Sequence, residues 1–364
     1  MKVSIYRIFP GILFSFLIAC IGIYLSKFIG SEILKLTKSP ISPIMISVII
    51  GLIIGNIFNI HIIFTEGIKF SLRFILRLGI ICLGIRLGLL DILKVGIVGI
   101  PLIIACIVFS ILLVNYFCKL LNVPSKIGSL IAVGTSICGA SAIVATSPAI
   151  NANEEEVTYA IANITIFGII AMFVYPFLAH YLFNGDELSV GLFLGTSIHE
   201  TAQVAGAGLI YSDQYSSPAT MDIATVIKLV RNISMIIVIP LVSYLYLKKN
   251  LKEKNTKPSI LSMFPIFIIG FIIMGLIRSI GDYGIQNSYE AFGIFSNDQW
   301  QLIIDYIKSL AEYSLAVAMA AVGISTNLVS LRNLGIRPFY VGLSAAVSVG
   351  FISYIGIIFL RYFI

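Results

Sequence analysis

The stretch GTSICGASAI, from Gly134 to Ile143, interrupts a chain that is otherwise rich in Ile, Leu, Val and Phe. The motif starts again downstream as GTSIHETAQV, from Gly195 to Val204, and this copy carries a His, a Glu and a Gln. Gly, Ser and Thr weaken helices, so each copy predicts an interruption in a helix. The same residues also allow close helix packing, and the first copy alone leaves both interpretations open.

The composition is that of an integral membrane protein. Of the 364 residues, 59% are hydrophobic and 11% are charged, and the mean hydropathy is +1.03. Soluble domains are about 45–50% apolar and about 25% charged. Long apolar runs favour helices over a barrel, whose strands would show alternation. We therefore expect an all-α membrane protein.

Eleven segments are apolar enough to be membrane spans, which need about 20 residues each. They are 10–30, 41–60, 70–90, 96–118, 127–150, 157–183, 189–211, 218–247, 258–281, 303–329 and 338–362. The basic loop KKNLKEKNTK, residues 248–257, is expected in the cytoplasm, which puts the N-terminus there too. The number of spans is ten if a GTSI segment is re-entrant rather than crossing.

The chain is expected to form one polytopic domain over residues 1–364, with internal repeats. Segments 84–96 and 323–335 share the pattern G-I-x3-L-x6-G and would run in opposite directions, as in an inverted repeat. So short a match can also arise by chance in an apolar sequence. A second pair, 134–176 and 195–240, repeats GTSI, a Ser-Pro and a final proline in the same order.

A helix that breaks inside the membrane leaves unpaired N–H groups at the start of its second half, and these favour an anion. Transporters use such breaks near the midplane. The small-residue segments and the charged residues near them therefore predict a substrate site. Its expected members are Thr135, Ser136, Gly139, Ser141, Thr196, Ser197, His199, Gln203, Lys228 and Arg231.

Ionisable residues within spans are costly and are usually functional. Glu200 and His199 lie mid-span and are expected to carry coupling protons. Lys228 and Arg231 are one helical turn apart and share a face. They require anionic partners, which the sequence leaves open as Glu200, Asp222 or a bound anion.

Other function classes find little support in the sequence. The net charge of +7 is accounted for by loops and spans, so no nucleic-acid partner is expected. The five cysteines lack metal-binding spacing. HETAQ lacks the second histidine of a metalloprotease motif, and no phosphate-binding G-x-x-x-x-G-K-[ST] motif is present. We therefore expect neither an enzyme nor a primary pump, and no cofactor or metal.

Four motifs in order, SICGASAI, HETAQVAGAG, KLVRN and AMAAVGISTNL, resemble the YeiH-type bacterial membrane proteins, which are labelled as sulfate exporters. The resemblance covers nearly the whole chain. It implies a core domain of crossing broken helices, a scaffold domain and elevator-like alternating access in the bacterial inner membrane. The wider superfamily includes cation–proton antiporters and bile-acid-type symporters. Its acidic ion-binding pair is absent here, where Asn163 and Thr165 stand instead.

The predicted function is a secondary transporter that exports a small anion, such as sulfate, sulfite or an organosulfonate, with proton coupling. The alternative is a monovalent cation–proton antiporter in which Glu200 binds the ion and Lys228 or Arg231 balances its charge. The expected partners are the anion, protons and the lipid bilayer. A scaffold domain of this kind would also favour a homodimer.

Overall fold

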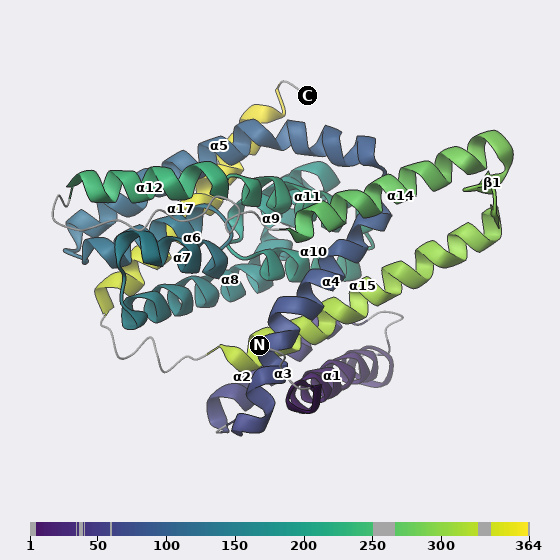
Figure 1. The fold of residues 1–364 in the computed structure, drawn as a ribbon, viewed down its shortest axis with the longest axis horizontal. Helices are drawn as coiled ribbons and strands as arrows, with labels where there is room; N and C mark the ends of the chain where they lie inside the picture. Colours follow the sequence, from purple (N-terminus) through teal and green to yellow (C-terminus); the bar gives the residue numbers. More distant parts are fainter. Residues whose placement is uncertain are drawn as a thin grey trace. The chain divides into compact units, whose positions relative to one another are not determined.

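The protein is almost entirely helical (Figure 1). The structure is a computed structural model that describes residues 5–33, 35, 39, 41–58, 60–249, 266–326 and 336–362. Within these ranges the only strands are two short ones that form a hairpin. The predicted all-α membrane fold is confirmed. The chain divides into two compact units, and each has its own core.

Six described helices are long and apolar enough to cross a membrane, and a pair bent by 42° supplies a seventh candidate. All eleven expected spans coincide at least in part with helix. Segments 41–60, 70–90, 127–150 and 189–211 fall on helices that are short or interrupted. Apolar composition alone does not reveal where a helix stops.

Unit 1 contains residues 1–97, 212–218 and 266–325. Its elements are α1 (Ile5–Phe28) with a π-helical end (Ile29–Ile33), α2 (Pro43–Ile57), α3 (Ile62–Phe70), a π-helical segment (Ser71–Ile75), α4 (Leu76–Leu83), a 3-10 turn (Gly84–Arg86), the start of α5 (Leu89–Leu120), α14 (Phe267–Ser288), β1 (Glu290–Ala291), β2 (Phe295–Ser296) and α15 (Asn297–Ser325). Helix α15 packs on α1, α2 and α4.

Glycines let the helices of unit 1 approach closely. A Cβ on Gly11 of α1 would lie 2.1 Å from the carbonyl oxygen of Phe64, and one on Gly67 of α3 would lie 2.1 Å from that of Ile8. The two backbones are therefore in contact, as at small-residue crossings in other membrane proteins. The remaining core of this region is apolar and includes Ile18, Ile68 and Ala320.

The expected long polar connection, 281–300, is mostly ordered secondary structure. Helix α14 continues to Ser288, and a hairpin of β1 and β2 leads into α15 (Figure 1). Trp300 donates a hydrogen bond of 2.9 Å to Asp282, and Asp282 also accepts one of 2.5 Å from Arg278. These contacts tie the end of α14 to the start of α15.

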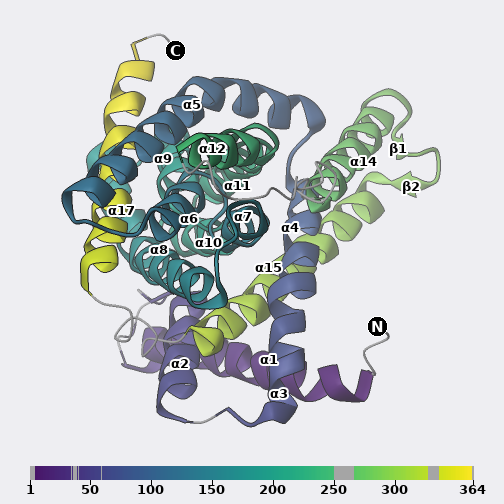
Figure 2. The ribbon, with the colours of Figure 1, turned by 60° about the vertical axis from the view of Figure 1, so that its left-hand side comes forward.

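Unit 2 contains residues 98–211, 219–265 and 326–364. Its elements are the rest of α5, α6 (Ser125–Ser136), α7 (Ala140–Thr146) with a 3-10 end (Ser147–Ile150), α8 (Glu154–Phe183), α9 (Glu187–Ser197), most of α10 (Thr201–Tyr215), α11 (Pro218–Ile233), α12 (Met235–Lys249) and α17 (Ile336–Leu360). Figure 2 shows α6, α7 and α10–α12 in the middle of this unit, with α5, α8 and α17 around them.

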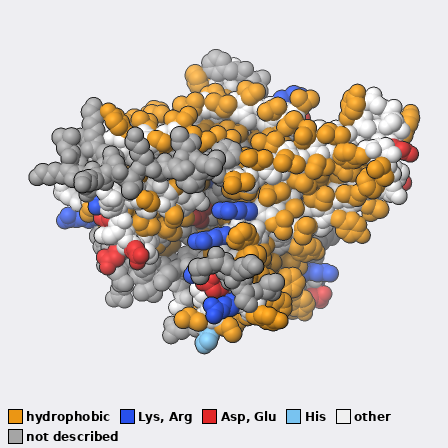
Figure 3. All heavy atoms as spheres, viewed as in Figure 1, with side chains coloured by type: hydrophobic (Ala, Val, Ile, Leu, Met, Phe, Trp, Pro, Cys, Tyr) orange, Lys and Arg blue, Asp and Glu red, His pale blue; other side chains and the backbone are white. Residues whose placement is uncertain are grey.

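The surface is strongly apolar. Figure 3 shows hydrophobic side chains over most of the described part of the face in view. Exposed large side chains recur along α5 (Ile97, Ile104, Leu112) and α14 (Ile269, Ile273, Ile280). Apolar surface of this extent indicates contact with lipid.

Two sequence predictions extend beyond the described residues. Most of the repeat segment 323–335 lies outside them, as does most of the basic loop 248–257. The inverted-repeat relationship and the cytoplasmic N-terminus therefore stay predictions. The proposed second repeat, 134–176 and 195–240, lies within the described chain, and both of its copies begin at a helix break.

Candidate functional site

The first GTSI copy ends a helix. Helix α6 stops at Ser136, and Ile137 has non-helical angles of φ −123° and ψ −95°. Gly139 then adopts φ 74° and ψ −127°, a conformation that side chains rarely permit. Helix α7 starts at Ala140. Ile137, Cys138 and Gly139 thus form a break of three residues between two helices.

The second copy ends a helix at the equivalent place. Helix α9 stops at Ser197, and Ile198 is extended, with φ −85° and ψ 141°. Helix α10 begins at Thr201. Both interruptions predicted from the sequence are therefore present, and both belong to unit 2.

Lys228, on α11, connects the two breaks. Its ammonium donates hydrogen bonds of 2.8 Å to the carbonyl oxygens of Ile137 and Ile198, and a third to that of His199. The side chain is fully buried. An ammonium has three donors, so all of them are used on backbone carbonyls.

Arg231, one turn along α11, makes the same kind of connection. It donates to the carbonyl oxygens of Ser136 at 2.7 Å, Thr196 at 2.5 Å and Ile198 at 3.3 Å, and also to that of Thr135. It is also fully buried. Helix C-terminal ends carry unpaired carbonyls and partial negative charge, so both cations stabilise the ends of α6 and α9.

These partners differ from the carboxylates considered from the sequence. Within the described residues neither Lys228 nor Arg231 forms an ion pair with Glu200. The cations have no donor facing a substrate position apart from one remaining N–H of the Arg231 guanidinium. Their expected role as direct substrate ligands stays a prediction, while their contact with both breaks is a feature of the structure.

Glu200 lies at the crossing of the two breaks. Its Oε1 accepts a hydrogen bond of 3.4 Å from the backbone N–H of Ala140, the first residue of α7. A Cβ on Gly139 would lie 2.3 Å from Cγ of Glu200, so the break passes directly against this side chain. Glu200 is half-buried, unlike the two cations. It is thus the accessible charged group of the crossing.

Gln203 has a structural position. Its Oε1 accepts from the N–H of Glu200 at 3.3 Å, as a residue at this position does in a capping box. Its amide donates to the carbonyl of Thr165 on α8 at 3.0 Å. Nearby, the amide of Asn232 donates to the hydroxyl of Thr201 at 2.9 Å. These bonds hold the start of α10 against α8 and α11.

Buried hydroxyls on the helical side of each break have partners within the protein. Thr196 shares a hydrogen bond of 2.7 Å with Ser353 on α17, and Ser136 donates to Ser110 on α5 at 3.4 Å. Ser197 donates to the carbonyl of Phe193 at 2.5 Å. Of the hydroxyl residues expected to bind substrate, Ser141 alone is exposed in the described chain; the buried ones are Thr135, Ser136, Thr196 and Ser197.

His199 is part of the second break and is almost fully buried. Its Nδ1 has no partner in the described part of the chain, which is unusual for a buried ring nitrogen. Nδ1 of His199, the residue next to Glu200 in the chain, can therefore still form a hydrogen bond.

The sequence of the chain matches a family of known proteins. A family model described as "Conserved hypothetical protein 698" matches residues 10–342. The chain belongs to this family, whose curated relatives are named UPF0324 membrane proteins. A relative from Fusobacterium nucleatum is 31% identical, over 94% of this chain and 95% of its own length. One from Streptococcus agalactiae serotype V is 30% identical, over 94% and 95%.

A relative from Pasteurella multocida is 34% identical over 83% of this chain and 84% of its own length. No solved structure matches this chain. The names of these relatives specify a membrane protein and no cargo. Membership of the family therefore supports a multi-pass membrane protein and does not specify a substrate.

Sequence reasoning missed several residues that shape the site. Ser110, Asn232 and Ser353 all contact residues of the crossing. Their signal is weak, because single polar residues within apolar helices are common. Asn232 directly follows Arg231 in the KLVRN motif, which could have indicated it.

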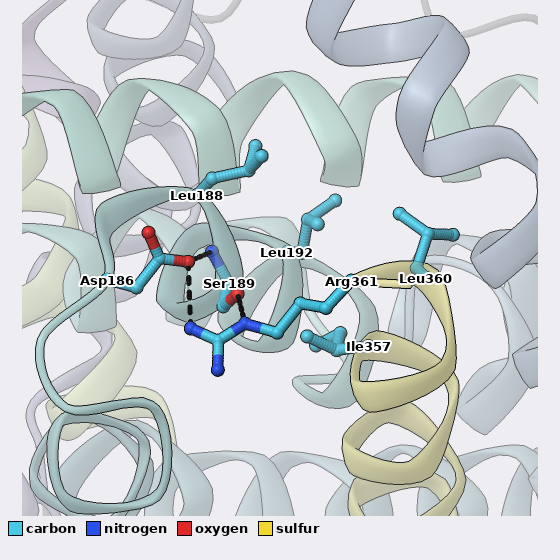
Figure 4. Close-up of a pocket in the computed structure, with 7 residues that line it drawn as sticks. All are labelled: Asp186, Leu188, Ser189, Leu192, Ile357, Leu360 and Arg361. Carbon is cyan, nitrogen blue, oxygen red and sulfur yellow. Dashed lines mark hydrogen bonds and ion pairs between the residues drawn. The ribbon is translucent and has the colours of Figure 1, made fainter. Parts of the chain in front are cut away.

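A separate small pocket lies at the other end of α9 (Figure 4). It has a volume of about 210 Å³ and lies between the start of α9 and the end of α17. Arg361 forms a 3.2 Å ion pair with Asp186 and a 3.0 Å hydrogen bond with Ser189 there. Because its charged groups are paired with each other, we treat it as a helix-end contact rather than a substrate site.

Proposed function

We propose that the protein is a secondary transporter that moves a small anion by alternating access, with Glu200 as the proton-coupling group. The substrate class is a sulfur oxoanion or an organosulfonate, exported across the bacterial cell membrane. The anion is bound where the N–H groups at the starts of α7 and α10 meet. His199, whose buried Nδ1 has no hydrogen-bond partner in the described chain, is a further polar group for this site.

The observation that carries the proposal is the hydrogen bond between Glu200 and Ala140. A carboxylate at the start of a helix is the protein's own equivalent of a bound anion. At 3.4 Å the bond is longer than the usual 2.9–3.0 Å or so, so a substrate anion can replace it. Ala140, Ser141 and Thr201 beside it are not buried, which leaves this side of the crossing open.

Competition between Glu200 and the anion provides the coupling. When Glu200 is ionised, its charge repels an anion and its oxygen occupies the donor at Ala140. When it is protonated, the repulsion falls and the donor becomes available. Proton and anion binding then favour each other reciprocally. A divalent anion carried with one proton keeps a net negative charge, and an inside-negative membrane potential drives that charge outward.

The contacts of Lys228 and Arg231 favour an anion over a cation. A cation site at a helix break uses free backbone carbonyls as ligands. Here the carbonyls of Ser136, Ile137 and Ile198 already accept hydrogen bonds from the two side chains. A sodium ion would have to displace a buried, hydrogen-bonded cation, so the cation–proton antiporter has less support.

Flux into proteoliposomes tests the proposal. Labelled sulfate, sulfite, taurine and Na⁺ would be measured with and without a pH gradient, using protein-free liposomes as the background. We expect flux of at least one anion, altered by the pH gradient, and no flux of Na⁺. Proton-coupled Na⁺ flux without anion flux would contradict the proposal and support the antiporter.

A further inference from the structure

A column of basic residues runs along consecutive helical segments of unit 1. Lys69, Arg73 and Arg77 are spaced four residues apart along α3, the π-helical segment and α4, so they follow one another turn by turn. All three are exposed. Other sides of the same helical segments are buried, at Gly67, Ile68, Ser71 and Gly79.

The column reaches membrane depth. A Cβ on Gly79 would lie 3.0 Å from Leu315 and 3.2 Å from the carbonyl of Ala311. Both residues belong to the central part of α15, a 29-residue helix that is long and apolar enough to span the membrane. Arg77 is two residues from Gly79, so it lies level with the central part of α15. Arginine in such a place requires a partner or a water-filled path.

Basic residues before and after the two arginines have carboxylate partners, but the arginines themselves do not. Lys69 pairs with Glu66 at 3.3 Å, and Arg86 pairs with Glu312 at 3.2 Å. Within the described chain Arg73 has no hydrogen bond or ion pair, and Arg77 contacts only the ring of Phe267, at 5.9 Å. Two neighbouring guanidinium groups therefore have unused donors at membrane depth.

We infer that Arg73 and Arg77 bind an oxyanion, as a second anion site on unit 1. Guanidinium groups match the planar edges of sulfate, sulfonate and phosphate with paired donors. Cβ atoms one turn apart are about 5–6 Å from each other, close enough for both arginines to hold one tetrahedral anion. The inference that the two arginines bind an oxyanion depends only on these contacts. A role of the site in binding the transported anion rests on the proposed function.

A phospholipid headgroup offers the same chemistry as a free oxyanion. Phe74 and Leu78 lie next to the arginines along the helix and are exposed, so an apolar chain has surface to contact there. A free oxyanion and a lipid headgroup both offer a phosphate or sulfate group, but only the lipid also has an apolar acyl chain. The experiment therefore needs one arm for each.

The test compares the full-length wild type with Arg73→Gln/Arg77→Gln. Lys308→Gln is the matched control, because Lys308 is a cation of unit 1 that pairs with Asp305 on the outside of α15. Arg73→Lys/Arg77→Lys retains the charge and guards against a folding defect. In the first arm, equilibrium binding of labelled sulfate is measured in detergent. In the second, melting temperature is compared in nanodiscs of phosphatidylcholine with and without phosphatidylglycerol.

We expect the double Gln variant to lose one sulfate site, or to bind it at least tenfold more weakly, with the Lys308 control unchanged and the double Lys variant intermediate. Loss only of stabilisation by phosphatidylglycerol would also support the oxyanion site and would assign it to a lipid headgroup. Wild-type behaviour of the double Gln variant in both arms would overturn the inference. Failure of the proposed function is distinguishable from failure of this inference. If only the proposed function is wrong, Glu200→Gln binds sulfate like wild type at every pH, and the double Gln variant still loses its site.

Discussion

The carboxylate of Glu200 meets the backbone N–H of Ala140 at 3.4 Å, across the point where the two broken helices cross. Lys228 and Arg231 contact the other helix ends, at the carbonyl termini of α6 and α9. The crossing therefore separates charge as helix dipoles require, with cations at C-terminal ends and the carboxylate at an N-terminal start. One acidic side chain is left where a substrate anion would bind.

Gly139→Ala tests the contact between the first break and Glu200. Gly139 has φ 74°, and an added Cβ would lie 2.3 Å from Cγ of Glu200. Gly293→Ala is the control, because Gly293 has φ 69° but nothing within 4 Å of the added atom. Both variants bear the backbone strain, about 1–3 kcal/mol. Only Gly139→Ala should also change the pH dependence of anion binding. Equal pH profiles for the two variants would show that Glu200 does not depend on this contact.

Arg231→Lys should reduce transport at least tenfold while the protein still folds. Lysine has three donors at one point, whereas Arg231 reaches four carbonyls spread over both breaks. A buried acceptor left unpaired costs about 1–3 kcal/mol, which thermal unfolding in detergent would detect. Arg361→Lys is the same change at a partly exposed site and should alter stability by less than about 1 kcal/mol. Anion flux at the wild-type rate in Arg231→Lys would show that transport does not depend on the guanidinium group.

Asp186 should contribute to stability in a pH-dependent way. Burial acts to raise its pKa, but hydrogen bonds from Ser189 and contact with Arg361 outweigh this and hold the pKa below its usual value. A lowered pKa stabilises the fold above the unfolded value, about 3.9, and this contribution is lost as pH falls through the folded pKa. The advantage of wild type over Asp186→Asn should therefore shrink below about pH 4.

Asp186 also caps α9, since its carboxylate accepts a 2.9 Å hydrogen bond from the N–H of Ser189. Asp186→Ala should cost about 1 kcal/mol at neutral pH, and Asp186→Asn less, because asparagine is also a good cap. Thermal unfolding as a function of pH measures both effects. Identical melting temperatures for wild type and Asp186→Ala would contradict the capping role.

The helix breaks were predictable from the sequence, and their electrostatic partners were not. Clusters of Gly, Ser and Thr within apolar runs identified where α6 and α9 end, and the spacing of Lys228 and Arg231 placed both on one face of α11. The sequence suggested Glu200 or Asp222 as their partners, because sequence patterns show only side chains. Which backbone carbonyls a break leaves unpaired is decided by the three-dimensional crossing.

Two other features could not be predicted from the sequence, for similar physical reasons. Gln203 looked like a substrate ligand because a polar residue within a span is costly, but a cap at the start of α10 satisfies its amide equally well. Hydropathy located the apolar segments but not every interruption within them, because it measures composition and not continuity. The π-helical segment Ser71–Ile75 and both GTSI breaks lie inside runs that are apolar throughout.

The central claim, that the Glu200 carboxylate competes with the transported anion, is tested most directly by anion binding to Glu200→Gln as a function of pH. Glutamine is neutral at every pH and resembles the protonated side chain. With labelled sulfate, or whichever anion shows flux, wild type should bind more weakly as pH rises. Glu200→Gln should bind equally well at high and low pH, exchange anion in counterflow, and fail to accumulate it with a proton gradient. Loss of binding at every pH in a folded Glu200→Gln protein would contradict the account and make Glu200 a direct ligand.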